Sequence, residues 1–130
     1  MKPFQGAIER QTLENKYFRQ VIFTSGYVQL VLMSLLPQEE IGNEVHSHTD
    51  QFFRIEHGEA KFIFDEKEVV LAHDGDAVIV PAGTYHNVIN NSKTELLKMY
   101  TLYSPPNHPD KTVHKTKKEA DAAEAAEHHS

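Results

Sequence analysis

The chain contains no cysteine, and this absence excludes a large class of possible sites. Disulfide bonds and thiolate metal centres cannot form, so any bound metal must be held by imidazole, carboxylate or amide oxygen. Basic residues are also few, with 13 Lys and Arg against 19 Asp and Glu and a net charge of −6. A non-specific nucleic-acid binder needs a basic surface to displace counterions, so we expect no nucleic-acid partner.

The sequence also lacks an apolar run of membrane-spanning length, and its first residues, MKPFQGAIER, lack the apolar centre of a signal peptide. We therefore expect no membrane partner and a cytoplasmic location. What the sequence does have is typical of a globular protein, with 39% hydrophobic and 25% charged residues. A length of 130 residues suffices for one domain with a hydrophobic core.

Short apolar or alternating runs, separated by Gly, Pro, Asn and Asp, fill residues 21–103. Many short strands at even spacing predict an all-β sandwich or barrel, and the lack of a helix-period stretch argues against a parallel α/β sheet. The predicted strands are Val21–Phe23, Tyr27–Leu35, Gln51–Glu56, Ala60–Phe64, Val69–Ala72, Ala77–Val80, His86–Asn90 and Glu95–Tyr103.

The two ends of the chain differ from this central part. Residues 1–20 form an N-terminal segment in which Thr12–Arg19 could make a helical turn with Thr12 as N-cap. The prolines of SPPNHP cannot continue a strand, so we expect the barrel domain to span 21–104 and a C-terminal extension to span 105–130.

The C-terminal extension is rich in Lys, Glu, Asp and Ala from Lys115 onward and contains nothing large and apolar there. This composition favours a helix locally but offers no face to bury, which predicts a frayed helix or a disordered tail. His128 and His129, at the end of this tail, are expected to bind nothing specific.

The stretch GDAVIVPAGTYHNVIN, residues 75–90, is the most informative in the chain. It reads Gly, five residues, Pro, one residue, Gly, two residues, His, three residues, Asn. Gly75 closes a turn that is expected to need a positive φ, and Pro81 with Gly83 makes a sharp turn before a strand that starts at His86. The spacing matches every fixed position of the second signature motif of the cupin superfamily, so the central part of the chain resembles a cupin.

Upstream, residues 42–51 read GNEVHSHTDQ and resemble a variant of the first cupin motif, which is Gly, five residues, His-x-His, three or four residues, Glu, six residues, Gly. Six residues separate Gln51 from Gly58, so the end of the motif fits with glutamine in place of glutamate. Counting back four residues from Gln51 places the motif's second histidine at His46 and its first at Glu44. Taking His46 and His48 as the pair leaves too few residues before Gln51.

The resemblance therefore predicts a metal site formed by Glu44, His46, Gln51 and His86, with His48 as the alternative to Glu44. Residues 44, 46 and 48 share one face of an extended segment, so strand geometry permits either choice. A carboxylate, two imidazoles and an amide oxygen suit a divalent Zn, Mn, Fe or Ni ion. The competing interpretation is a metal-free pocket lined by histidines.

Two further polar residues are candidates for the substrate pocket. Gln29 is a polar residue in an otherwise apolar strand, and Tyr100 lies on one face of the last long strand. The alternation of that strand places Tyr100 opposite Thr101 and Tyr103 but leaves open which set faces the interior. Arg54 is expected on the outer face, opposite to Gln51.

The resemblance implies a small single-domain cupin, a double-stranded β-helix that forms a jelly-roll-like barrel of two antiparallel sheets, similar to a sugar-isomerase-like subgroup. It also implies a homodimer that exchanges N-terminal strands. The expected function is that of a metal-dependent enzyme acting on a small polar substrate such as a sugar or phosphosugar. The alternatives are a dioxygenase with Fe(II) or a similar redox metal, and a non-catalytic module that binds a sugar or metabolite.

Overall fold

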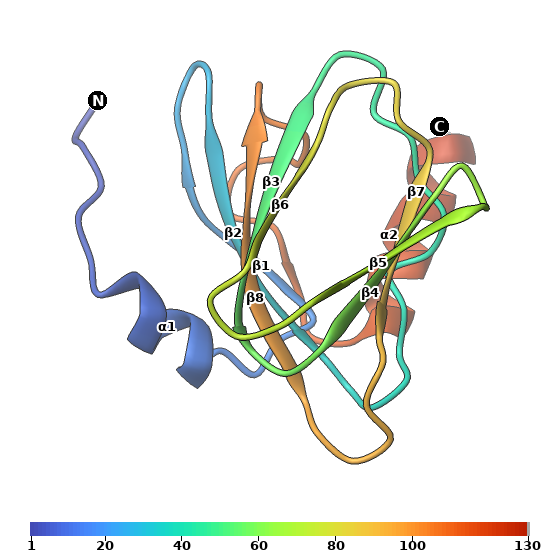
Figure 1. Cartoon of the computed structure of the whole chain (residues 1–130). Coiled ribbons are helices and arrows are strands. Elements are labelled where there is room, and N and C mark those ends of the chain that lie inside the picture. The colour runs from blue at the N-terminus through green and yellow to red at the C-terminus, as the bar shows by residue number, and fades with distance from the viewer. Residues whose placement is uncertain (130) are drawn as a thin grey trace.

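The computed structural model describes the backbone of residues 1–129 and the side chains of residues 1–126, and it shows a β-barrel with one helix at each end of the chain (Figure 1). The helices are α1, Ile8–Glu14, and α2, Lys117–His129. The strands are β1 Arg19–Thr24, β2 Gln29–Leu35, β3 Asp50–His57, β4 Ala60–Phe64, β5 Glu68–Ala72, β6 Ala77–Val80, β7 His86–Asn90, β8 Leu97–Ser104 and β9 Val113–His114.

The strands form two antiparallel sheets, which confirms the predicted fold class. Sheet A has six strands in the order β6-β3-β8-β2-β1-β9, and sheet B has three in the order β5-β4-β7. Residues 40–46 run beside β7, where isolated bridges join Glu40 to Ile89 and Glu44 to His86. This segment thus extends sheet B by one irregular strand, and it carries two of the predicted ligands.

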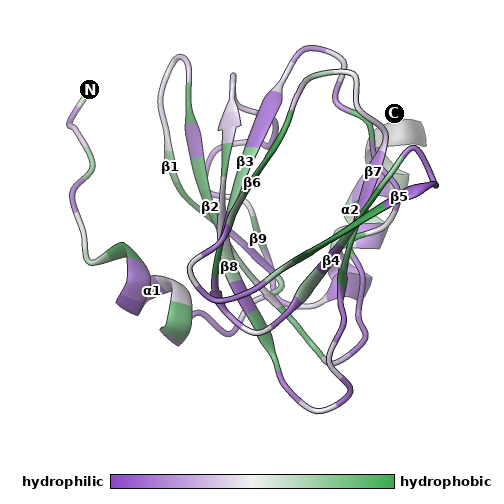
Figure 2. Cartoon of the chain, viewed as in Figure 1, coloured by the Kyte–Doolittle hydropathy of each residue, from purple (hydrophilic) through white to green (hydrophobic). Residues whose placement is uncertain are grey.

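The hydrophobic core lies between the two sheets, because alternate side chains of each strand point inward. Phe53 and Ile55 of β3, Phe62 of β4 and Met99 of β8 are all fully buried. Figure 2 shows that hydrophobic residues recur along the strands, whereas the connecting loops are mostly hydrophilic. As predicted, Arg54 lies on the outer face, where its Nε donates to the Glu56 carboxylate at 2.9 Å.

All eight predicted strands are present, and the ends of β4, β6 and β7 agree with the prediction. The ninth strand, β9, was not predicted. It is only two residues long, follows the proline-rich loop, and exists because Val113 and His114 pair with Gln20 and Arg19 of β1. Gly75 has the expected positive φ of 88°.

The N-terminal helix begins earlier than predicted, at Ile8, and the assignment of Thr12 as N-cap was wrong. Thr12 is a buried residue within the helix, and its hydroxyl donates to the Ile8 carbonyl at 2.7 Å. Helix α1 packs against β2, β3 and β8 of sheet A. The position of helix α1 is therefore determined by tertiary packing and not by an N-cap.

The C-terminal tail is helical, and the prediction that it has no face to bury was wrong. Ala120 is only 5% exposed and belongs to the main hydrophobic cluster, so small alanine side chains suffice for close packing. The hydroxyl of Thr116 accepts the Glu119 N–H at 3.1 Å and so caps α2. The expectation for the His128 and His129 side chains lies outside the described residues. Among residues 1–129, no helix is long and apolar enough to cross a membrane.

Candidate metal centre

Glu44 and His86 are brought together by the backbone. The Glu44 N–H donates to the His86 carbonyl at 2.8 Å, and the His86 N–H donates to the Glu44 carbonyl at 2.9 Å. Two residues that exchange both hydrogen bonds in an antiparallel pair project their side chains on the same face, as neighbours. The segment before β3 and the first residue of β7 thus place one carboxylate beside one imidazole.

His46 is held over the same face by the turn of the second motif. His46 follows Glu44 by two residues, and the His46 carbonyl accepts the Gly83 N–H at 2.8 Å. Gly83 has a φ of 85°, a conformation that favours glycine. The Ala82 N–H next to it donates to the Asp50 carboxylate at 2.8 Å, which fixes the turn against the start of β3.

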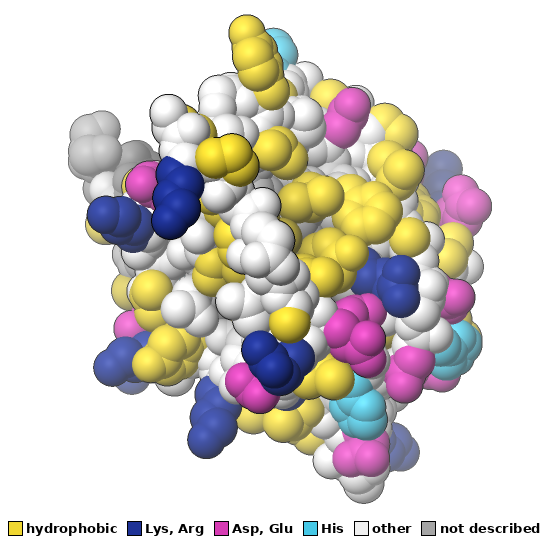
Figure 3. All heavy atoms as spheres, turned by 90° about the vertical axis from the view of Figure 1, so that its left-hand side faces the viewer, with side chains coloured by type: hydrophobic (Ala, Val, Ile, Leu, Met, Phe, Trp, Pro, Cys, Tyr) yellow, Lys and Arg dark blue, Asp and Glu magenta, His cyan; other side chains and the backbone are white. Residues whose placement is uncertain are grey.

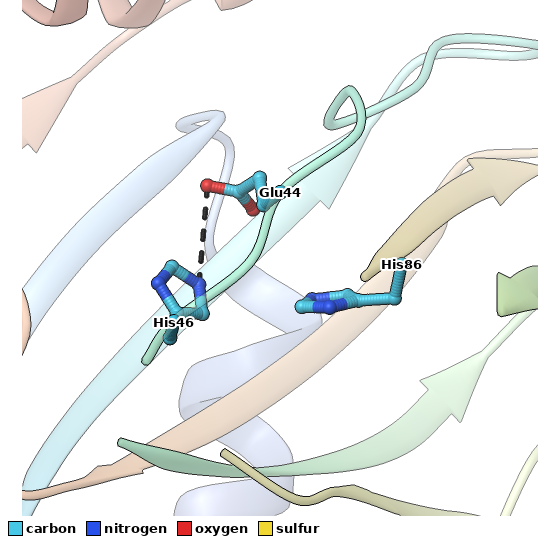
Figure 4. Close-up of side chains that lie close together, drawn as sticks. All are labelled: Glu44, His46 and His86. Carbon is cyan, nitrogen blue, oxygen red and sulfur yellow. Dashed lines mark ion pairs between the residues drawn. The ribbon is translucent and has the colours of Figure 1, made fainter. Parts of the chain in front are cut away.

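The side chains of Glu44, His46 and His86 point toward one another (Figure 4). One ligand atom from each lies within 4.8 Å of the other two. His46 Nε2 lies 4.0 Å from Glu44 Oε2, and the two imidazole rings have centroids 5.8 Å apart. Ligand atoms sit at about 2 Å from a bound transition metal, so one ion could contact all three after small side-chain rotations.

Three buried polar atoms on the predicted ligands have no hydrogen-bond partner among the described residues: His46 Nε2, Gln51 Oε1 and His86 Nε2. Buried polar atoms are almost always bonded, so the three on these ligands indicate a missing partner. His86 Nδ1 lies 2.9 Å from the Thr84 carbonyl, which can only accept. The proton therefore sits on Nδ1, and Nε2 presents a lone pair, as a metal ligand must.

Gln51 is oriented by its neighbours on sheet A. Its side chain is 1% exposed, and its Nε2 donates to the Thr101 hydroxyl at 3.0 Å. With the amide nitrogen engaged in this way, the amide oxygen is left without a donor. The donor set of carboxylate, imidazole and amide oxygen fits a divalent transition metal.

The charges of the group also suit a cation. Burial raises the pKa of Glu44 to about 7, against the opposing effect of the Arg19 charge. Burial lowers the pKa of His46 to about 4, with further lowering by His86 and Arg19. Burial likewise lowers the pKa of His86. Both imidazoles are therefore neutral near pH 7, and a divalent ion would favour the charged form of the buried Glu44 carboxylate.

The alternative ligand, His48, is exposed and lies outside the group. The structure thus places Glu44 with His46 and His86, in the register counted from Gln51. Their role as metal ligands stays a prediction.

The two predicted pocket residues are placed elsewhere. Tyr100 lies on the outer face of sheet A, 6.2 Å from the Phe52 ring, because β8 turns Thr101 and Tyr103 inward. The prediction for Tyr100 is corrected accordingly. Gln29 is fully buried, but its amide bonds to Thr24 and to the backbone of the loop at residues 107–108, so it ties that loop to β2.

Several residues that the sequence did not single out do lie at the site. They line one cavity of about 370 Å³ together with Glu44 and His46, and they include Phe18, Arg19, Tyr85, His108, His114 and Lys117. Tyr103 lies deeper, with its ring 5.7 Å from the His46 ring and its hydroxyl 3.3 Å from His108 Nε2. Burial raises the pKa of the Tyr103 hydroxyl, so it keeps its proton at neutral pH.

Comparison with known proteins agrees with this fold. The family model described as a cupin domain matches residues 31–103. The chain is 46% identical over 128 residues to the uncharacterized protein YrkC of Bacillus subtilis, covering 95% of this chain and 68% of that protein. It is 47% identical over 106 residues to an uncharacterized protein of Acanthamoeba polyphaga mimivirus, covering 78% of this chain and 65% of the relative.

Among solved structures, the crystal structure of BH2720 from Bacillus halodurans superimposes with a TM-score of 0.90 and 40% identity, covering 93% of this chain and 95% of that one. None of these three similar proteins is named for an activity. The chain spans about two thirds of the length of the two curated relatives.

Proposed function

Because this chain belongs to the cupin family, we propose that it binds a divalent transition metal at Glu44, His46, Gln51 and His86 and acts on a small polar molecule there. The observation that carries the proposal is the set of three buried polar atoms without partners, one each on His46, Gln51 and His86. A cation would satisfy all three atoms as acceptors and would also offset the Glu44 charge.

The proposed reaction is isomerisation or epimerisation of a sugar or phosphosugar. A bound divalent ion would supply Lewis acidity toward a carbonyl or hydroxyl oxygen of the substrate. The chain supplies a partly open cavity of about 370 Å³, a size common for small-molecule sites, and the ring of Tyr103 lies 5.7 Å from the His46 ring. Tyr103, which His108 contacts at 3.3 Å, is the candidate for donating a hydrogen bond or a proton.

The metal site is tested by elemental analysis of the purified protein and two variants. We expect His86→Ala to lose the bound metal, because it removes the ligand with the best-defined lone pair. His48→Ala is the matched control, since His48 is exposed and lies outside the group, and it should retain the metal. Metal retained by His86→Ala, or no metal above trace in the unmodified protein, would refute the site.

Dioxygenation is the second candidate, and a specific observation favours it. The group formed by Glu44, His46 and His86 has the composition of the two-histidine, one-carboxylate sites of non-haem iron oxygenases. Metal identity and oxygen uptake separate the two reactions. Iron with oxygen consumption supports dioxygenation, whereas zinc or manganese with turnover of aldose–ketose pairs in the absence of oxygen supports isomerisation. Ligand binding without turnover would instead support a non-catalytic binding module.

We also propose that the protein is a homodimer, as cupin resemblance implies. The face in Figure 3 gathers apolar side chains, and a shallow groove on the same side is lined by Phe4, Phe23, Leu30 and Leu102. Phe4 remains 37% exposed there and packs on Phe23 at 5.8 Å. Light scattering should report twice the chain mass; a monomer would contradict the proposal. The predicted barrel boundaries of 21–104 and the cytoplasmic location stay predictions.

A further inference from the structure

Arg19 is a buried cation in the wall of the metal cavity. It is 6% exposed and is the first residue of β1, between Met33 of β2 and His114 of β9. Like Val21, it projects to the inner face of sheet A. Arginine is rarely buried to this extent unless an anion or another acceptor pairs with it.

The partners of Arg19 do not neutralise it. Its Nη1 lies 3.2 Å from His114 Nδ1, and an imidazole carries no negative charge that would offset the guanidinium. Its Nε is buried and has no hydrogen-bond partner among the described residues. No ion pair within 4.0 Å joins Arg19 to a carboxylate of the described side chains. The edge of the guanidinium that carries Nε therefore has no acceptor among the described residues.

The other charged groups of the cavity are less suited than Arg19 to bind an anion. Lys117 of α2 is paired with Asp121 at 2.6 Å, so the two largely cancel. Glu124 lines the outer part of the cavity and is exposed. Arg19 lines the same cavity as Glu44 and His46, so its charge lies in the wall around the metal group. A molecule that occupies this cavity would be within reach of both the ion and the guanidinium.

We propose that Arg19 binds a carboxylate or phosphate group of the substrate, so that the cavity selects a small, hydroxylated, anionic molecule and not a neutral one. The inference deepens the proposed function and rests on it. The planar guanidinium suits either group because its parallel N–H bonds match two oxygens of a carboxylate or phosphate. The divalent ion would hold the reacting oxygens, and Arg19 would fix the other end of the molecule.

The test is calorimetric titration of the metal-loaded protein with four probes. Glucuronate, glucose 6-phosphate and glucose share one ring and differ at one carbon in bearing a carboxylate, a phosphate or a neutral hydroxyl, and inorganic phosphate is the smallest probe. We expect at least one anion to bind and glucose to bind more weakly than its charged counterparts. Tighter binding of glucuronate identifies a carboxylate site, and tighter binding of glucose 6-phosphate identifies a phosphate site.

Variants then assign the preference to Arg19. Arg19→Gln should weaken binding of the preferred anion roughly tenfold to a hundredfold, the loss expected for charge-assisted hydrogen bonds, and Arg19→Lys should restore part of it. Arg54→Gln is the matched control, since Arg54 lies in the same sheet but faces outward and pairs with Glu56. It should bind the anion as the unmodified protein does.

Metal content is measured on every sample, because it distinguishes a failure of the proposed metal-dependent function from a failure of the Arg19 inference. Arg19→Gln should retain its metal, because Arg19 is not a ligand. If the unmodified protein holds no metal, the proposed function fails. If metal is present but glucose binds as well as the anions, if none of the four probes binds at tens of millimolar, or if Arg19→Gln binds them undiminished, the Arg19 inference is wrong. The comparison of probes on the unmodified protein stands even if Arg19→Gln fails to fold.

Discussion

Gln29 and Gln51 flank Tyr103 at one end of sheet A, and the groups around them, called the corner around Gln29 and the corner around Gln51, have the same burial and opposite bonding. Both residues pair with Tyr103 across sheet A, Gln29 from β2 and Gln51 from β3, and both are at most 1% exposed. The Gln29 amide bonds to Thr24 and three times to the loop at residues 107–108. The Gln51 amide donates to Thr101, and its oxygen has no partner.

The difference separates a structural glutamine from one that is available to a ligand. Asn90, at the other end of β7 from His86, repeats the structural pattern, since its amide donates to three backbone carbonyls and accepts the Ser92 N–H. Buried amides in this fold are therefore normally saturated. The free oxygen of Gln51 is an exception confined to the corner that holds Glu44, His46 and His86.

The largest effect on stability is expected for Gln29→Met. This change keeps the volume but removes four hydrogen bonds, leaving the backbone at residues 107–108 without its partner. We expect a loss of about 2–3 kcal/mol in the free energy of unfolding, measured by chemical denaturation of the metal-free protein. An effect as small as that of a surface substitution would show that the loop does not depend on Gln29. The contrast between a structural Gln29 and an available Gln51 would then be wrong.

The matched change in the other corner, Gln51→Met, should cost less than about 1 kcal/mol in the same metal-free assay, because the bond to Thr101 and an interaction with the Tyr103 hydroxyl are lost but an unsatisfied oxygen is also removed. Its effect should instead fall on metal affinity, which titration with Zn²⁺ would measure. If Gln51→Met destabilises the metal-free protein as much as Gln29→Met does, the oxygen of Gln51 is not an open ligand position.

The residues around Gln51 could be predicted from the sequence because their spacings along the chain are short. The turn at Gly83, the start of β7 at His86 and the six residues from Gln51 to Gly58 are short-range spacings that a motif records. Counting from Gln51 favoured Glu44 over His48, and the bridge between Glu44 and His86 explains why that register brings the two side chains together. The alternation of apolar residues likewise located all eight long strands.

The remainder of the cavity depends on long-range pairing that no spacing records. Tyr100 and Tyr103 alternate on β8, and only the pairing of Tyr103 with Gln51 shows which of them faces inward. Arg19 lies in the site because β9, after a proline-rich loop, returns to pair with β1. Helix α2 covers the cavity although its alanines carry little hydrophobic signal.

The last expected effect is a pH dependence that comes from the corner around Gln29. Gln29 holds the backbone of His108, whose side chain contacts Tyr103 and lines the same cavity as Arg19, His114 and His46. Burial, then the charges of Arg19, His114 and His46, lowers the pKa of His108 to about 3. The unfolded chain, with a histidine pKa of about 6.5, binds this proton more readily, so the folded state loses stability as the pH falls below about 6.5.

His108→Asn removes this one contribution and should flatten the pH dependence. Between about pH 7 and about pH 5, the unmodified protein should lose on the order of 1 kcal/mol more unfolding free energy than the variant does. Metal-free samples are required, so that metal release at acid pH does not enter the comparison. His48→Asn serves as the control, because His48 is exposed and its replacement should leave the slope unchanged. Parallel curves for the unmodified protein and His108→Asn would mean that His108 is solvated in the folded state and that the loop tied down by Gln29 does not bury it.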